Sequence, residues 1–171
     1  MVEQRLRLTG RDEGLAVSVL TELRGADSPN LVLSALTQIF PEISVETMPP
    51  EPKFGQGATC DWSFDDVSLA TFLNLLHEQR ILDTALDAMS LNLNGEQTKF
   101  NISRMAALAG KISFPIPGEL PLGGVITVEL EGQGLDEWLQ AATWHAGRSQ
   151  VPRSINDDLA MNQDGESSTW L

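Results

Sequence analysis

One short sequence pattern occurs three times in this chain, and it is the strongest constraint on the fold. An alternating apolar segment ends in glycine, and another glycine follows fifteen residues later; the segments are 6–10 (LRLTG), 91–95 (LNLNG) and 128–132 (VELEG), and the later glycines are Gly25, Gly110 and Gly147. Alternation is typical of a half-buried strand, and glycine ends many helices. Each pattern therefore predicts a strand, a tight turn and a short helix.

Length and composition indicate one ordinary folded domain or two very small ones. The chain has 171 residues, 42% of them hydrophobic, which is enough apolar material to bury a core. We expect an α+β or α/β fold, with a mixed sheet and helices packed on it. Residues 1–147 are predicted to form a single compact domain, or two small halves at 1–94 and 95–147, and residues 148–171 an acidic, polar C-terminal tail.

Strands and helices are expected to alternate through the first 94 residues. The periodicity predicts, in order, a strand at 2–8, helices at 12–25 and 28–39, a strand at 43–48, a loop at 49–57, a strand at 60–64, a long helix from about residue 69 and a strand at 91–95. Ser28 followed by Pro29 is a strong helix start. The long helix either continues through Met89 or breaks near Gln79 and Arg80. This order matches the ferredoxin-like βαββαβ arrangement with an extra helix.

The second half of the chain leaves one choice open. Residues 100–108 form either a short helix or the return strand of a hairpin that turns at Asn94 and Gly95. Residues 111–116 predict an edge strand, because Pro115 has no N–H to donate within a sheet. The remaining elements are a stronger strand at 124–130 and a final helix at 135–145.

The net charge narrows the class of partner. Acidic residues outnumber basic ones by 24 to 11, so the formal charge is −13 at pH 7. A field of this sign repels phosphate backbones and anionic lipid surfaces and attracts basic proteins. We therefore expect a protein partner of basic character, no direct binding to nucleic acid and no membrane association. Solubility alone is the alternative explanation of this composition.

The sequence also predicts a cytoplasmic location. No apolar run approaches the roughly eighteen residues of a membrane-spanning helix. A secretory signal requires an apolar stretch after its basic residues, and the N-terminal residues of this chain contain none. Cys60 is the only cysteine, which excludes an internal disulfide and agrees with a reducing compartment.

The residues that most often carry chemistry are scattered along the chain. His77 and His145 lie on different predicted helices with no second ligand at metal spacing, and Cys60 has no base near it in sequence. Asp83 and Asp87 lie one helical turn apart, where a solvated acidic face is a simpler explanation than a metal or acid–base site. We therefore predict no catalytic residue, no cofactor and no metal.

A site assembled from residues far apart in sequence is the alternative to this negative result. Its candidates are Asp61, Asp65, Asp66 and His77, because groups at a strand end often carry function in proteins built from strands and helices. Helix capping is the simpler role for Asp65 and Asp66.

Candidates for partner binding lie near the C-terminus. An acidic segment with an aromatic anchor suits a small interface, because a buried aromatic ring is its usual hot spot. The candidate residues are Trp144, Asp157, Asp158, Trp170 and Leu171.

These observations favour a non-enzymatic intracellular protein-binding module with an acidic surface, such as an adaptor, assembly factor, inhibitor or dedicated subunit of a complex. One alternative is an enzyme or small-ligand-binding protein with a dispersed site. The second is a homo-oligomeric structural protein that self-assembles through an exposed sheet edge, for instance near residues 111–116.

Overall fold

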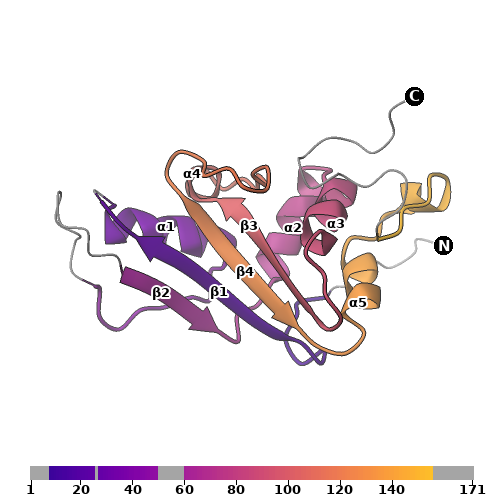
Figure 1. Ribbon diagram of the computed structural model, residues 1–171, viewed down its shortest axis with the longest axis horizontal. Coiled ribbons are helices and arrows are strands. Elements are labelled where there is room, and N and C mark those ends of the chain that lie inside the picture. The colour runs from indigo at the N-terminus through magenta and orange to yellow at the C-terminus, as the bar shows by residue number, and fades with distance from the viewer. Residues whose placement is uncertain (1–7, 26, 50–59, 156–171) are drawn as a thin grey trace.

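The computed structural model describes residues 8–25, 27–49 and 60–155. In these residues a four-stranded antiparallel sheet packs against helices on one of its faces, so the predicted α+β class is confirmed (Figure 1). The strands are β1 (Ala16–Leu23), β2 (Cys60–Asp65), β3 (Gln97–Ser103) and β4 (Val125–Glu131), in the spatial order β2-β1-β4-β3. The helices are α1 (Pro29–Ile39), α2 (Ala70–Glu78), α3 (Leu82–Ser90), α4 (Arg104–Leu108) and α5 (Leu135–Ala142), and a 3₁₀ turn follows at Ala146–Ser149.

Strand β1 lies where the sequence predicted a helix at 12–25. The side chains of Val17, Val19, Thr21 and Leu23 are buried, while those between them are exposed or half-buried. The same residues also place apolar side chains at helical spacing, which is why the helix was predicted. Three of the four buried residues are β-branched, and such side chains lose rotamer freedom in a helix but pack well in a sheet. The helix prediction was therefore wrong.

The helix start at Ser28 and Pro29 is confirmed. Ser28 is the N-cap of α1 and its hydroxyl accepts a hydrogen bond from the Leu31 N–H (3.5 Å). The long helix predicted after β2 is divided into α2 and α3, which is one of the two alternatives that the sequence left open. Between α2 and α3, Arg80 has a φ of +58° and its N–H donates to the His77 carbonyl (3.1 Å). A residue in the left-handed region cannot continue a right-handed helix, so α3 begins anew.

The strand predicted at 91–95 is instead a turn that leads into β3. Gly95 has a φ of +63°, and Asn94 and Gln97 pair as an isolated bridge across the turn. The sequence left a strand and a short helix as alternatives for residues 100–108. The segment contains both, since it includes the end of β3 and the whole of α4. Asn-Gly is a favoured tight-turn dipeptide, and here the turn leads directly into β3, with no strand before it to form a hairpin.

The ferredoxin-like arrangement was wrong. Within residues 1–94 the described chain has two strands, β1 and β2, and these are direct antiparallel neighbours; β3 and β4 come from later in the chain. The described strands include no parallel pair, so the expected mixed sheet was also wrong. Residues 43–48 form a loop rather than a strand. The strand predicted at 2–8 lies outside the described residues except for Leu8. Among the repeated patterns, as far as the structure describes them, only the third, at 128–132, leads through glycine from a strand into a helix.

Residues 111–116 form no strand, and they cover the edge of β3. The Gln79 side chain takes the place of a strand partner, because its amide N–H donates to the Ile112 carbonyl (2.9 Å) and its amide oxygen accepts from the Ile112 N–H (2.8 Å). The Ser113 carbonyl accepts from the Ser103 N–H at the end of β3 (2.9 Å). This segment is therefore not the free sheet edge expected for self-assembly.

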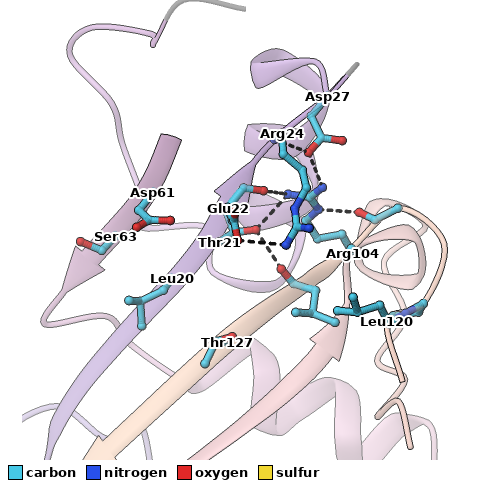
Figure 2. A pocket seen from close by; sticks show the side chains of 14 residues that line it. Leu20, Thr21, Glu22, Arg24, Asp27, Asp61, Ser63, Arg104, Leu120 and Thr127 are labelled. Carbon is cyan, nitrogen blue, oxygen red and sulfur yellow. Dashed lines mark hydrogen bonds and ion pairs between the residues drawn. The ribbon is translucent and has the colours of Figure 1, made fainter. Parts of the chain in front are cut away.

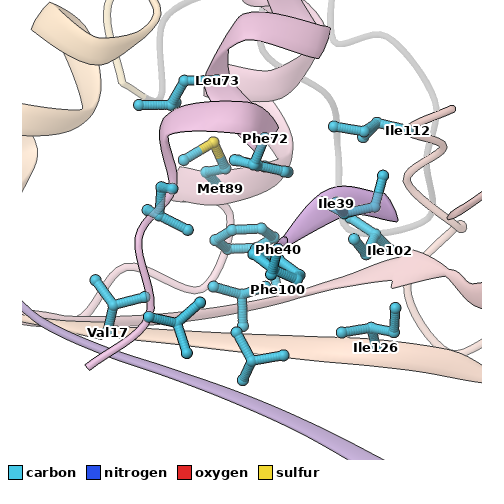
Figure 3. Packing of buried hydrophobic residues seen from close by; sticks show 14 of the residues in the cluster. Val17, Ile39, Phe40, Phe72, Leu73, Met89, Phe100, Ile102, Ile112 and Ile126 are labelled. Carbon is cyan, nitrogen blue, oxygen red and sulfur yellow. The ribbon is translucent and has the colours of Figure 1, made fainter. Parts of the chain in front are cut away.

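A hydrophobic core lies between the sheet and the helices. Stacked rings cross it: the Phe40 ring centroid lies 6.2 Å from that of Phe72, which lies 5.8 Å from that of Phe100 (Figure 3). These residues belong to the end of α1, to α2 and to β3, respectively. Side chains from both 1–94 and 95–147 therefore meet in the same cluster.

Two arginines after α5 attach the following chain to α3. The Arg148 guanidinium donates to an Asp83 carboxylate oxygen (2.8 Å), and the Arg153 guanidinium donates to Asp87. His145 Nε2 lies 3.0 Å from the same Asp83 oxygen. The two carboxylates assigned from the sequence to a solvated face are thus ion-paired. The start of the predicted tail packs on the domain, and its residues 156–171 lie outside the described residues.

The charge on Asp83 should stabilise the fold in a pH-dependent way. Burial raises the pKa of Asp83, but hydrogen bonds from Arg148 and His145 outweigh burial and hold the pKa below its ordinary value of 3.8. The stabilisation is therefore present above pH 3.8 and is lost as the pH falls through the lowered pKa of the folded state. Replacing the carboxylate in Asp83→Asn should lower the free energy of unfolding by about 1 kcal/mol at neutral pH.

Urea denaturation at several pH values between neutral and about pH 3 checks this expectation. The difference between wild type and Asp83→Asn should narrow as the pH falls. Asp12→Asn is the matched control, because Asp12 is exposed and has a φ of +58°, which asparagine also tolerates. A difference that stays constant with pH would show that the Asp83 charge is not the stabilising feature.

Candidate functional site

The sheet face that points away from the core is polar and acidic. Alternate side chains of each strand point to this face, and these are exposed or half-buried. Five carboxylates project there from three adjoining strands: Asp61 and Asp65 from β2, Glu22 from β1, and Glu129 and Glu131 from β4. We call these five residues the acidic face.

Register places two of these carboxylates directly opposite each other. Glu22 pairs with Asp61 across β1 and β2. Like charges at such positions destabilise a sheet, by a magnitude of about 0.2–1 kcal/mol. Arg24 offsets part of this repulsion through an exposed ion pair with Glu22 (3.1 Å). The Glu22–Asp61 pair therefore does not contribute to holding the strands together.

The other carboxylates have weak or neutral partners. Ser18 donates from its hydroxyl to Asp65 (2.9 Å), and the Lys99 ammonium lies 3.7 Å from Glu129. Both interactions are exposed to solvent, where an ion pair is worth at most about 1 kcal/mol. A cationic ligand can therefore compete for these carboxylates at little cost.

A cavity of about 500 Å³ lies at one end of the acidic face (Figure 2). Leu20 and Thr127 form its floor on β1 and β4, and Asp61 and Ser63 approach it from β2. The loop before β4 closes the other side, where Leu120 lines the cavity. The cavity thus combines a carboxylate, hydroxyls and apolar side chains.

Arg104 builds the wall of this cavity. The residue is only 6% exposed. Its guanidinium donates to the Glu22 carbonyl (2.7 Å), the Thr21 hydroxyl (3.0 Å), the Gly123 carbonyl (2.6 Å) and the Asp27 carboxylate (2.9 Å). These contacts join β1, the approach to α1 and the loop before β4. Because four of its five guanidinium N–H groups are engaged, Arg104 positions the cavity rather than offering a free cation to a ligand.

Gly124 allows this close approach. Its φ is +80°, and a Cβ there would lie 2.8 Å from an Arg104 guanidinium nitrogen. Both the backbone conformation and the space therefore require glycine. Gly123 and Gly124 both have a positive φ and form the turn into β4.

Three exposed apolar side chains lie on, or next to, the loop that closes the cavity, and one of them, Leu120, lines it. Met105, Leu120 and Leu122 are 54%, 77% and 83% exposed, respectively. The Met105 side chain lies against Gly123, since a Cβ on that glycine would be 2.5 Å from Met105 Cγ. We call these three side chains the apolar rim. Exposed apolar residues that gather beside a polar surface are typical of protein-binding sites.

A second, smaller cavity of about 270 Å³ brings the two histidines together. His77 and His145 line it with Arg80, Asp83 and Thr84, although the sequence placed the histidines on separate helices. His145 is held by Asp83. In the described part of the chain, no three His, Cys, Asp or Glu side chains are arranged to hold a metal ion.

The residues proposed for a dispersed site do not converge. Asp61 and Asp65 lie on the acidic face, while Asp66 follows β2 with a φ of +54° and lies 3.8 Å from the Arg11 guanidinium. His77 lines the other cavity. Cys60 is free and exposed at the start of β2.

Of the residues predicted to bind a partner, the structure describes one. Trp144 is 39% exposed and follows the end of α5. The others lie outside the described residues: Asp157, Asp158, Trp170 and Leu171.

Sequence reasoning missed Glu22, Glu129 and Arg104 as site residues. Glu22 and Glu129 were counted only within the net charge, because their common face depends on β1 being a strand paired with β4. The alternation of Val17, Val19 and Thr21 carried that information. No local signal identifies Arg104, whose partner Asp27 is 77 residues away.

Comparison with known proteins identifies relatives and a shared fold. No family model matches the chain. A UPF0201 protein of Sulfurisphaera tokodaii is 32% identical over 130 residues, which cover 74% of this chain and 88% of that protein. A UPF0201 protein of Methanothermobacter thermautotrophicus is 27% identical over 141 residues, covering 82% and 98%. These names state no activity.

Two solved structures share the architecture. The crystal structure of the UPF0201 protein from Methanococcus jannaschii has a TM-score of 0.62 at 20% identity and covers 77% of this chain and 96% of its own. Another UPF0201 crystal structure has a TM-score of 0.58 at 24% identity, covering 73% and 90%. Among the described residues, no helix is both long enough and apolar enough to cross a membrane.

Removing the Arg104 guanidinium should strongly destabilise the protein. Arg104→Leu leaves the half-buried Asp27 carboxylate without its ion pair, so the free energy of unfolding should fall by about 3 kcal/mol. The same change at Arg24, which lines the same cavity but is exposed, should cost less than about 0.5 kcal/mol. Urea denaturation measures both, and equal losses would contradict the role given to Arg104.

Proposed function

The chain belongs to the UPF0201 family, and we propose that it is a protein-binding module whose acidic face holds a basic segment of a partner protein. One observation supports this most directly: five carboxylates lie on one face of three adjoining strands, and two of them oppose each other in register. Such an arrangement weakens the sheet. A cationic partner would relieve the repulsion, so binding and sheet stability would rise together.

The net charge acts in the same direction over longer distances. At −13, the chain attracts a basic protein before contact and repels a phosphate backbone. Complementary charge mainly raises the association rate and the specificity of a complex. Affinity for the partner should therefore decrease as salt rises.

The apolar rim supplies a part of the interface that does not depend on charge. Interfaces usually combine an apolar centre with a polar surround, and a few buried side chains provide most of the binding energy. Leu120 lines the cavity and Leu122 lies two residues further along the loop. A partner that places an apolar side chain here and basic residues along the sheet would match both surfaces.

The proposal includes a place in the cell and a role there. An adaptor or dedicated subunit of a complex needs a binding surface and no catalytic group. Cys60 is free and exposed, which suits the reducing cytoplasm. The protein would therefore act in the cytoplasm, bound to a basic protein as part of a larger assembly.

Affinity capture from the native lysate tests this function. The tagged full chain should retain a basic protein in stoichiometric amount at about 50 mM salt and release it at about 500 mM, because screening weakens contacts between exposed charges. The variant Glu22→Gln/Asp61→Asn should retain less than about a tenth of that amount.

A matched variant controls for net charge. Glu96→Gln/Glu137→Gln also removes two exposed carboxylates, but neither belongs to the acidic face, since Glu96 lies in the turn before β3 and Glu137 lies on α5. It should capture the partner as wild type does. Equal capture by both double variants, or capture that does not change with salt, would count against the acidic face as the binding surface.

A further inference from the structure

In the part of the chain that the structure describes, the two edges of the sheet differ, and β2 forms the open one. β2 pairs with β1 along one side only, and in the described residues no backbone hydrogen bond is made from its other side (Figure 1). β3, the opposite edge strand, is covered: its Ser103 N–H donates to Ser113, and its Lys99 carbonyl accepts from the Asn92 side chain (3.1 Å). An unpaired strand edge is a template for another strand.

The side chains of β2 alternate between two kinds of chemistry. Asp61 and Asp65 point to the acidic face, with Ser63 between them. Trp62 and Phe64 point to the other face, where their ring centroids lie 5.5 Å apart and they are only partly buried. Both rings pack against the hydrophobic core and keep part of their surface exposed. One strand therefore offers carboxylates on one side and aromatic rings on the other.

A second copy of this chain does not fit the edge. If two β2 strands paired antiparallel about Ser63, Asp61 of each copy would face Asp65 of the other. Directly opposed like charges are destabilising, and charged residues on an edge strand are a common protection against self-pairing. The same carboxylates favour a strand of opposite charge.

We propose that β2 accepts an added strand from the partner, in which Lys or Arg alternates with apolar residues. Residues opposite each other in paired strands point to the same face. The basic side chains would therefore meet Asp61 and Asp65, and the apolar ones would lie against Trp62 and Phe64. Main-chain hydrogen bonds would provide affinity and the alternating pattern would provide specificity. This inference rests on the proposed function and adds how the partner is held.

Synthetic peptides test the pattern and the backbone pairing separately. The first peptide is Lys-Val-Lys-Val-Lys-Val, and the second has the same composition in blocks, Lys-Lys-Lys-Val-Val-Val. Two further versions of the first carry N-methyl groups on one or the other alternate set of backbone amides. Dissociation constants with the full chain are measured at about 50 mM salt, and amide NMR shifts locate the binding site.

Strand addition makes a distinctive prediction. The alternating peptide should bind at least about tenfold more tightly than the block peptide. Methylation of the amide set that faces β2 should abolish binding, while methylation of the other set should leave it unchanged. The largest NMR shifts should fall in residues 60–65. Asp61→Asn/Asp65→Asn should weaken binding about tenfold, and the Glu96→Gln/Glu137→Gln control should not.

Other outcomes separate this inference from the proposed function. Equal binding of the alternating and block peptides, with no effect of either methylation, would overturn strand addition and leave the acidic face as a binding surface. Shifts centred on β3 would also overturn it. If no peptide binds while the lysate partner still depends on Glu22 and Asp61, strand addition fails alone. If that dependence is absent as well, both proposals fail.

Discussion

The Arg104 guanidinium holds together the end of the sheet where the candidate site lies. It binds the backbone and a side chain of β1, the carboxylate of Asp27 before α1, and the Gly123 carbonyl in the loop before β4. A buried cation must have partners for its donors, so these segments can only take positions that satisfy it. The cavity beside the acidic face follows from this constraint, as does the need for glycine at position 124.

The same strands carry an apolar face that stabilises the fold and an acidic face that destabilises it. On the core side, alternating apolar residues of β1 and β4 pack in a continuous cluster. On the other side, Glu22 and Asp61 repel each other. Burial of one Val or Leu side chain contributes about 1.5–3 kcal/mol, which exceeds the cost of one cross-strand repulsion. The core can therefore support an acidic face that would not hold a sheet together by itself.

Sequence reasoning predicted those elements whose signals are local. Ser28 and Pro29 mark the start of α1 because capping acts within one helical turn. The segment 16–23 was misjudged because it has both helical and strand spacing, and its strand neighbours decide between them. The edge strand expected at 111–116 is absent because Gln79, more than thirty residues away, satisfies the backbone of Ile112. The candidate site depends on register in the same way: the acidity was visible in the composition, but its common face required paired strands.

The ion pairs that attach the chain after α5 to α3 also affect the order in which native contacts form during synthesis. Asp83 and Asp87 find their cations 65 and 66 residues later, at Arg148 and Arg153. During synthesis, α3 emerges from the ribosome long before either arginine, so its two carboxylates stay without these partners until the sheet and α5 have been made. Because domains generally fold as units as the chain emerges, this helix gains its final contacts among the last. A chain that stops short of Arg148 therefore lacks both of these arginine ion pairs.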